Sequence, residues 1–277
     1  MIVDAHLHLW DPDRLDYPWL AEVPPLLRAF GPEDLDPGGY QLTAAVFVEA
    51  GCRDPIAEVE WVEEIAGRWP TLAAAVAYAP LERGAEVASR LAVLAKHHLV
   101  RGVRRNTQDE APGFAASEEY AAGTRLLADH GFTADLCIRH HQLPDVIRLV
   151  AAVPEVTFVL DHLGKPDIRN RLWEPWREQL SRLAGFPNVM CKLSGLTTEA
   201  DPDHWTVADL TPYLRHALAE FGPERCLAGG DWPVSTLATG YARWWDTLAT
   251  VLDDHPAADR AQVLGGTATR VYRLEAA

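Results

Sequence analysis

Apolar runs of strand length alternate with amphipathic stretches along most of this chain. The apolar runs cover residues 2–6, 43–49, 72–79, 100–104, 133–138, 156–161, 188–193 and 225–229. Between them, apolar residues recur at steps of three and four, which is typical of amphipathic helices. The stretches with this spacing are 55–68, 84–97, 118–130, 142–152, 175–185, 207–221 and 241–253. Alternating strands and helices predict a parallel sheet, and eight strands close a barrel of about 250 residues. We therefore predict an α/β protein, a single (β/α)8 TIM barrel.

An open, doubly wound sheet is the alternative that this alternation leaves. A G-x-G-x-x-G motif after the first strand would favour it, and this motif is missing. The barrel interpretation places all of 1–277 in one domain. Residues 9–40 break the alternation: they are rich in Pro, Asp and Gly, yet they carry Trp10, Trp19 and Phe30. We expect an ordered, irregular capping loop with short helical pieces over one end of the barrel.

Composition limits which classes of binding partner and which cellular compartment we expect for this protein. The formal net charge of −15 argues against nucleic acid or an anionic membrane as the main partner. No apolar run approaches the roughly 20 residues of a membrane span, and the N-terminal segment does not have the pattern of a signal peptide. The cysteines are not spaced as CxxC, so we expect buried, reduced thiols. These features predict a cytoplasmic protein acting on a small molecule, and they are compatible with a homo-oligomer.

Polar side chains follow almost every predicted strand. In barrels of this type the functional site lies at the carboxyl ends of the strands, so these residues should converge on one rim. They are His6 and His8 (first strand), Glu49 (second), Arg104 (fourth), Arg139 (fifth), His162 (sixth), Lys192 and Ser194 (seventh) and Asp231 (eighth). A rim of imidazoles, cations and carboxylates makes an enzyme the leading interpretation.

His6, His8 and Asp231 are the predicted metal ligands. Residues two apart on a strand share a face, so both imidazoles should point the same way. Neutral imidazoles and a carboxylate are ligands that zinc binds well, and we expect one divalent ion, preferably Zn²⁺. The competing interpretations are hydrogen-bonded core histidines and a helix-capping Asp231. Asp161 should face away from His162 and have a structural role, because the two residues are adjacent on a strand.

The remaining rim residues are candidates for contacts with substrate. His162 would complete a ligand set or polarise a carbonyl group, and Arg104 and Lys192 are cations suited to a substrate oxygen. Salt bridges to Glu49 are an equally good interpretation of the two cations. The predicted substrate-binding residues are Glu49, Trp10, Trp232, Ser194 and His140.

Several motifs, taken together and in order, resemble the amidohydrolase superfamily, in particular its amidohydrolase-related group, which contains sugar lactonases. The motifs are Ile2-Val-Asp-Ala-His-Leu-His-Leu-Trp-Asp11, Phe47-Val-Glu-Ala50, Gly102-Val-Arg104, Asp161-His-Leu-Gly-Lys-Pro166, Lys192-Leu-Ser-Gly195, Gly230-Asp-Trp-Pro233 and Leu264-Gly-Gly-Thr-Ala-Thr-Arg-Val-Tyr-Arg-Leu274. The resemblance implies a (β/α)8 barrel that hydrolyses an ester or lactone, with His6, His8, His162 and Asp231 as site residues.

The chain also departs from the pattern of this superfamily. Members with two metals have a lysine after the fourth strand, where this chain has Arg104-Arg105, and a histidine after the fifth, where it has Cys137-Ile-Arg139. Both differences argue against a binuclear centre.

The predicted reaction is hydrolysis of a small sugar-derived lactone, with Asp231 as general base and then general acid. A divalent ion, or His162 with Lys192 or Arg104 in a metal-free reaction, would stabilise the oxyanion. One enzymatic alternative is a zinc-dependent decarboxylase in which Arg104 holds the substrate carboxylate. A sugar-acid binding protein is the non-enzymatic alternative.

Overall fold

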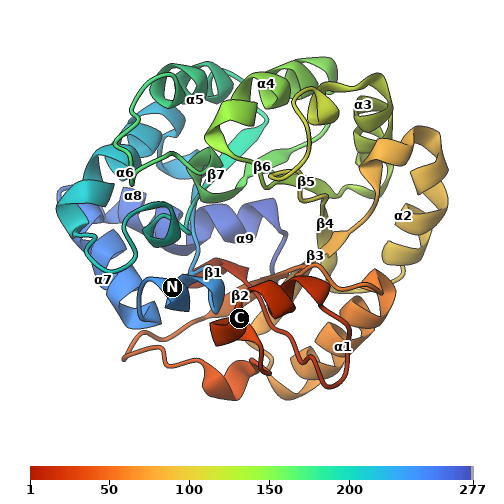
Figure 1. Cartoon of the computed structure of the whole chain (residues 1–277), viewed down its shortest axis with the longest axis horizontal. Helices are drawn as coiled ribbons and strands as arrows, with labels where there is room; N and C mark the ends of the chain where they lie inside the picture. The colour runs from red at the N-terminus through yellow and green to blue at the C-terminus, as the bar shows by residue number, and fades with distance from the viewer. Residues whose placement is uncertain (276–277) are drawn as a thin grey trace.

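The computed structural model describes residues 1–275 and shows a parallel β/α barrel (Figure 1). Within those residues, eight strands join one sheet in sequence order, each parallel to the next. They are β1 (Val3–Leu7), β2 (Ala44–Val48), β3 (Leu72–Tyr78), β4 (Val100–Arg104), β5 (Thr133–Leu136), β6 (Phe158–Leu160), β7 (Val189–Leu193) and β8 (Cys226–Ala228). The (β/α)8 prediction is confirmed.

Helices surround the strands as an outer layer (Figure 1). They are α1 (Pro55–Arg68), α2 (Ala88–Leu94), α3 (Glu118–Arg125), α4 (Leu143–Ala152), α5 (Trp176–Ala184), α6 (Val207–Phe221), α7 (Tyr241–Leu252), α8 (Ala257–Ala261) and α9 (Thr267–Val271). The start of α1 follows from its sequence: the Asp54 carboxylate accepts the N–H groups of Ile56 and Ala57, both at 3.2 Å, and Pro55 needs no partner there. The single helix predicted over 84–97 is wrong. Gly84 has φ +58 and interrupts a 3-10 segment, so α2 begins only at Ala88.

Two apolar layers hold the barrel together. Outward-facing strand residues such as Phe47 and Phe158 pack with helix residues such as Trp176. Inward-facing residues such as Val46 and Val159 form a second cluster inside the barrel. Ala268 and Val271 of α9 and the following Tyr272 belong to this inner cluster, so side chains of the C-terminal helix cover the barrel interior at the end where the strands begin. The remaining space inside is polar and lies under the site described below.

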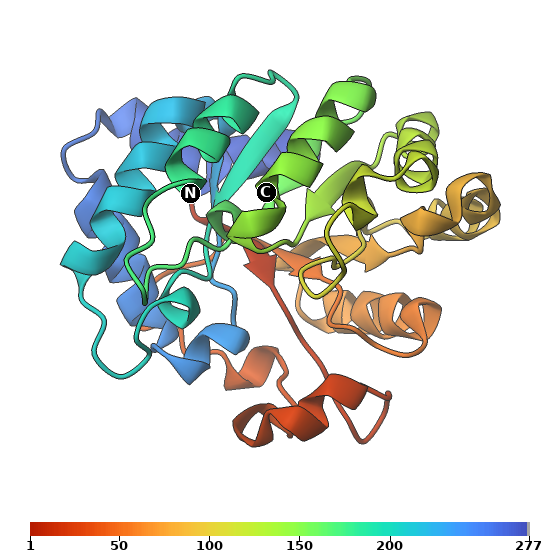
Figure 2. The same cartoon turned by 45° about the horizontal axis from the view of Figure 1, so that its top comes forward.

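The barrel closes between β1 and the segment after β8. The Asp231 N–H donates to the His6 carbonyl and the His8 N–H donates to the Trp232 carbonyl, each at 2.7 Å. The chain then leaves the barrel at residues 9–40, which contain short 3-10 helices (Pro18–Glu22, Pro24–Leu26 and Pro32–Asp34). Figure 2 shows this segment standing out beyond one end of the barrel. Its position matches the predicted capping loop, whereas the assignment of 1–277 to one domain stays a prediction.

Two further expectations can be compared with the structure. The four cysteines are buried and free, as expected. Burial raises the pKa of Cys226 to about 12, so this thiol stays protonated at neutral pH. Among the helices of residues 1–275, none is long and apolar enough to cross a membrane.

Candidate active site

His6 and His8 come from the end of β1 and lie side by side. Their Nε2 atoms are 3.2 Å apart, and the rings meet edge to face. The Nδ1 atom of His8 lies 2.8 Å from the Val48 carbonyl, and Nδ1 of His6 lies 3.2 Å from Oδ1 of Asp161. The oxygen acceptor at Nδ1 of His8 favours the tautomer with the proton on that atom, which leaves the His8 Nε2 lone pair facing His6. Nδ1 of His6 also lies 3.2 Å from the Lys192 ammonium group, so it faces both an acceptor and a donor.

Asp231 faces these two imidazoles from the eighth strand end. Its Oδ1 lies 3.6 Å from His8 Nε2, 3.7 Å from His6 Nε2 and 3.8 Å from Nε2 of His162. Burial alone would raise the pKa of Asp231, but electrostatic attraction to the neighbouring His162 and the hydrogen bond with His8 hold it well below the usual range. Burial lowers the pKa of His162 to about 4 and that of His6 well below its usual value. At neutral pH the site therefore contains the Asp231 carboxylate beside the neutral imidazoles of His6 and His162.

His6, His8 and Asp231 fit a divalent ion. Their donor atoms lie within 4.8 Å of one another. Ligand atoms at about 2.0–2.1 Å from a tetrahedral zinc ion lie about 3.3 Å apart, close to the observed spacing. The two Nε2 atoms lie 3.2 Å apart and both face Asp231, so one ion could contact all three side chains. A second group of donors, His6, Asp161 and His162, fits less well, because ammonium and guanidinium groups already occupy both Asp161 oxygens.

Unusual backbone conformations place His162 and Asp231. Both have φ +53, in the left-handed region that non-glycine residues rarely adopt. This turn directs the His162 ring toward His6, with ring centroids 4.4 Å apart. The expected opposite orientation of Asp161 is therefore wrong: both side chains reach His6, because the strand alternation ends at Leu160.

Gly195 leaves room for this arrangement. It has φ +65, and a Cβ atom there would lie 2.4 Å from Nδ1 of His162 and 2.9 Å from Oδ2 of Asp231. The neighbouring Ser194 holds the same imidazole, with Oγ 2.9 Å from Nδ1. Any side chain at position 195 would displace the imidazole or the carboxylate.

Asp4 fixes the position of the segment that carries Asp231. Its Oδ1 accepts the Gly230 N–H at 2.8 Å, and its Oδ2 accepts the Tyr241 hydroxyl of α7 at 2.7 Å. A Cβ on Gly230 would lie 2.6 Å from Asp4 Oδ2 and 2.4 Å from the Tyr241 ring. The glycine before Asp231 thus allows close packing against Asp4 and Tyr241.

A buried ion network lies beneath the imidazoles. The Lys192 ammonium group donates to Oδ2 of Asp135 at 2.6 Å and lies 2.9 Å from Oδ1 of Asp161, the oxygen that also faces His6. The Tyr272 hydroxyl donates to Asp135 at 2.6 Å. Burial would lower the pKa of Lys192, but the two carboxylates raise it above its usual value, so the side chain is a cation. The network thereby fixes His6 from below.

Arg104 joins this network to the cavity wall. Its Nε donates to Glu49 Oε1 at 2.7 Å, one terminal nitrogen donates to the Glu49 carbonyl at 2.6 Å, and the other donates to Asp161 Oδ2 at 3.2 Å. Salt bridging with Glu49, which the sequence left open, is thus present. A guanidinium group has five N–H donors, so two remain for a ligand.

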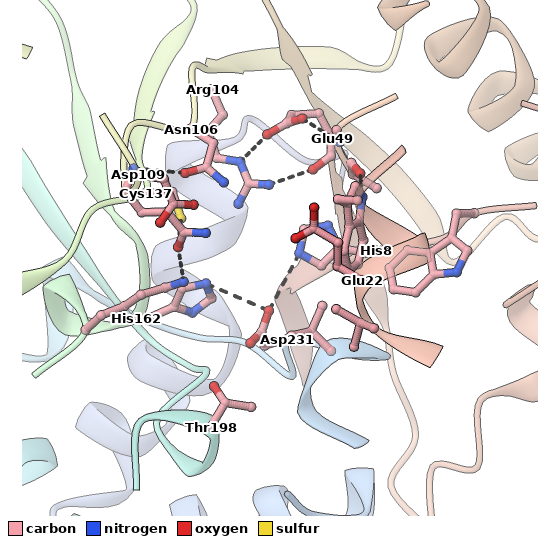
Figure 3. A pocket seen from close by; sticks show the side chains of 18 of the residues that line it. His8, Glu22, Glu49, Arg104, Asn106, Asp109, Cys137, His162, Thr198 and Asp231 are labelled. Atoms are coloured by element: carbon pink, nitrogen blue, oxygen red, sulfur yellow. Dashed lines mark hydrogen bonds and ion pairs between the residues drawn. The ribbon is translucent and has the colours of Figure 1, made fainter. Parts of the chain in front are cut away.

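A cavity of about 610 Å³ opens above these groups. Figure 3 shows His8, His162 and Asp231 facing one another at one side of it, with Arg104 and Glu49 opposite. Apolar surface comes from the capping segment and polar surface from loops after the strands. The lining residues are His8, Trp10, Pro18, Trp19, Glu22, Val23, Glu49, Ala50, Gly51, Arg104, Asn106, Gln108, Asp109, Cys137, His162, Lys165, Thr198, Asp231 and Val234. Its volume suits a small polar ligand.

Some predicted residues do not line this cavity. His6, Lys192 and Ser194 are buried below it, and Trp232 packs against Phe30 with ring centroids 5.6 Å apart. His140 lies beside it, with Nδ1 3.3 Å from the Lys165 carbonyl. Arg139 does not line the cavity either: its side chain is 45% exposed and pairs with Asp109, which is one of the lining residues.

Sequence reasoning missed Lys165 as a cavity residue. This lysine has φ +50, and its ammonium group donates to Gln108. Burial would lower the pKa of Lys165, but the neighbouring Cys137, Glu199 and Asp231 raise it, which makes it a second cation in the cavity beside Arg104. The Gly164-Lys-Pro166 sequence marked a turn, and nothing in it indicated that the lysine points inward.

A parallel β/α barrel with three imidazoles and a carboxylate at one rim defines the protein as a barrel enzyme whose chemistry depends on these groups. Residues 3–274 match the family model described as Amidohydrolase. The chain belongs to this family, and the resemblance and the hydrolase prediction drawn from the sequence are confirmed.

Known lactonases are similar to this protein over nearly the whole chain. An L-fucono-1,5-lactonase of Burkholderia multivorans is 36% identical over 295 residues, with 98% of this chain and 96% of the relative covered. An L-fucono-1,5-lactonase of Burkholderia ambifaria is 34% identical and covers 99% of this chain and 96% of itself. A crystal structure of a Burkholderia multivorans amidohydrolase with bound zinc superposes with a TM-score of 0.90 at 34% identity, covering 99% of this chain and all of the other.

Proposed function

We propose that the protein hydrolyses a small sugar-derived lactone to its hydroxy acid. The observation that carries the proposal is the Asp231 carboxylate, held among three imidazoles at the base of a cavity that also contains Arg104 and Lys165. The similar proteins named L-fucono-1,5-lactonase support a lactone over the decarboxylase alternative. Lactones of six-carbon deoxy sugars are the first substrates to test.

His6, His8 and Asp231 would hold one divalent ion, for which zinc is the leading candidate because a similar amidohydrolase structure contains it. When bound, such an ion lowers the pKa of a coordinated water and polarises a carbonyl group. A carboxylate with a low pKa is a weak base, so this chemistry suits Asp231.

Asp231 accepts a proton from the water that attacks the lactone carbonyl carbon. The negative charge that develops on the carbonyl oxygen is stabilised by Arg104, Lys165 or the His162 imidazole, all of which line the cavity. The ring C–O bond then breaks, and protonated Asp231 returns its proton to the departing oxygen. The new carboxylic acid ionises and releases one proton.

Lys192 acts differently from the role first assigned to it. It is fully buried and its ammonium group is bound by two carboxylates, so we assign it the positioning of Asp161 and, through Asp161, of His6. Ser194 positions His162 in the same way. Among the predicted substrate contacts, Trp10 and Glu49 line the cavity and keep that role.

Proton release from a panel of sugar lactones tests the proposal, with the metal content of the purified protein measured alongside. We expect Asp231→Asn to lower kcat by about 10²–10⁴-fold, the usual contribution of acid–base catalysis. Removal of the metal by a chelator should lower the rate, and zinc should restore it. Near-normal turnover by Asp231→Asn on every lactone that the enzyme accepts would contradict the mechanism, and carbon dioxide release from a carboxylic acid would favour the decarboxylase.

A further inference from the structure

A second cavity, of about 470 Å³, opens beside the candidate active site. Its walls come from the loop that leads into α1, from the end of β3, from α2 and from the residues after β4, and Figure 1 shows these elements next to one another. It shares Glu49, Gly51 and Asn106 with the larger cavity. It therefore lies at the carboxyl ends of the strands, the end where barrels bind their ligands.

Arginine dominates the walls of this cavity. Its lining includes Arg53, Arg83, Arg90 and Arg105 but only one carboxylate, Glu49. The whole chain has 40 acidic against 25 basic residues and a formal net charge of −15. Even where carboxylates pair with some of these arginines, the remaining guanidinium groups give the cavity a local positive charge, which attracts an anion in an otherwise acidic protein.

Two of these arginines are already neutralised and two are free. Arg53 pairs with Asp16 at 2.5 Å, and Arg105 pairs with Glu82 at 3.1 Å. Over residues 1–275, the guanidinium groups of Arg83 and Arg90 make neither an ion pair nor a hydrogen bond. Their donors are available to a ligand in the cavity.

Tyr78 adds a neutral donor to the same wall. It ends β3 and lines the cavity. Burial raises the pKa of its phenol, so the hydroxyl keeps its proton at neutral pH. Guanidinium forks and a hydroxyl group match the oxygens of a carboxylate or phosphate, which arginine binds through paired N–H groups.

We propose that the cavity lined by Arg83, Arg90 and Tyr78 is a subsite for a small oxyanion, and that its ligand is the carboxylate of the hydroxy acid formed next to it. This identification of the ligand rests on the proposed function. A lactone is neutral and its hydrolysis product is an anion, so the arginines attract the product and not the substrate. The shared wall at Glu49, Gly51 and Asn106 places the subsite beside the reaction cavity.

Isothermal titration of the purified enzyme tests this subsite with D-gluconate, L-fuconate and inorganic phosphate at constant ionic strength. The test variant is R83Q/R90Q. The control variant is R215Q/R260Q, which removes the same charge from exposed arginines that pair with Asp254 and Asp253. We expect the sugar acids to bind at least tenfold more weakly to R83Q/R90Q and equally well to wild type and control. Initial rates on a neutral lactone should stay within twofold of wild type in the control R215Q/R260Q.

Each other outcome has a defined meaning. If the sugar acids bind equally well to wild type and R83Q/R90Q, they occupy the larger cavity, and the proposed subsite is wrong. The proposed subsite is also wrong if none of the three anions binds to the wild type. Weakened binding of phosphate alone supports an oxyanion subsite but overturns the product as its ligand. Because titration needs no turnover, the subsite is tested even if every lactone proves inert and the proposed function fails.

Discussion

Glu58 gives a sharp test of the electrostatics under the cavity wall. Its side chain on α1 is 1% exposed, and Oε1 accepts the Ala50 N–H at 3.0 Å. Burial raises the pKa of Glu58 to about 8, and the charge of Glu49 adds to the effect. At neutral pH, Glu58 is therefore mostly a neutral carboxylic acid in the folded protein.

The sign of the pH dependence follows from the two states of Glu58. In the unfolded chain its pKa is near 4.5, so this state loses the proton first as the pH rises. Between pH 4.5 and about 8 the folded state binds more protons, and its stability falls with rising pH. The slope is about 1.4 kcal/mol per pH unit, and the whole shift amounts to about 5 kcal/mol at most.

Glu58→Gln removes this titration and keeps an oxygen for the Ala50 N–H. Its stability relative to wild type should therefore rise steadily from pH 5 to pH 8, as measured by urea unfolding at each pH. Glu60→Gln on the exposed side of α1 is the matched control, and its difference from wild type should stay constant. A Glu58→Gln difference that is flat with pH, or that falls, would refute the neutral, buried carboxyl group.

Two other substitutions test the geometry of the site. Gly195→Ala brings a Cβ within 2.4 Å of the His162 ring. It should lower kcat/KM at least 100-fold and leave the far-UV circular dichroism spectrum unchanged. The control is Gly240→Ala, whose Cβ meets no atom within 4 Å, and it should behave as wild type. Asp161→Asn leaves the Lys192 ammonium group with one carboxylate. It should lower the affinity for zinc about 10–100-fold in a titration. It should also lower the free energy of unfolding, measured in urea, by about 3–5 kcal/mol. Unchanged zinc affinity would show that Asp161 does not position His6.

The fold was predictable from the sequence because local patterns determine most of it. The amphipathic spacing of 55–68 coincides with the observed Pro55–Arg68, and the apolar runs coincide with the strands. The error at α2 has a specific cause. A glycine within a helical pattern is usually tolerated, but Gly84 adopts φ +58 and ends the regular structure there. Spacing alone does not reveal such a backbone angle.

The site was predictable only where strand geometry applies. His6, His8 and Asp231 meet as expected, because barrel topology brings the strand ends together. Asp161 was wrongly placed, since the alternation of a strand was extended one residue beyond its end. Lys192 was correctly assigned to the seventh strand, but its depth in the barrel follows from its partners on other strands, which no local pattern encodes.

Charged side chains buried under the imidazoles contribute little to the stability of a barrel, so another role must explain them. Lys192, Asp135 and Asp161 are almost fully buried, and replacing such groups by apolar residues of similar volume is often neutral or stabilising. Barrel interiors of this fold are usually filled with branched apolar side chains, as the Val46 and Val159 cluster shows. An apolar filling would leave Nδ1 of His6 without a polar partner and the ring free to turn either nitrogen to the cavity. The ion network is thus explained by the orientation of one imidazole rather than by the stability of the barrel.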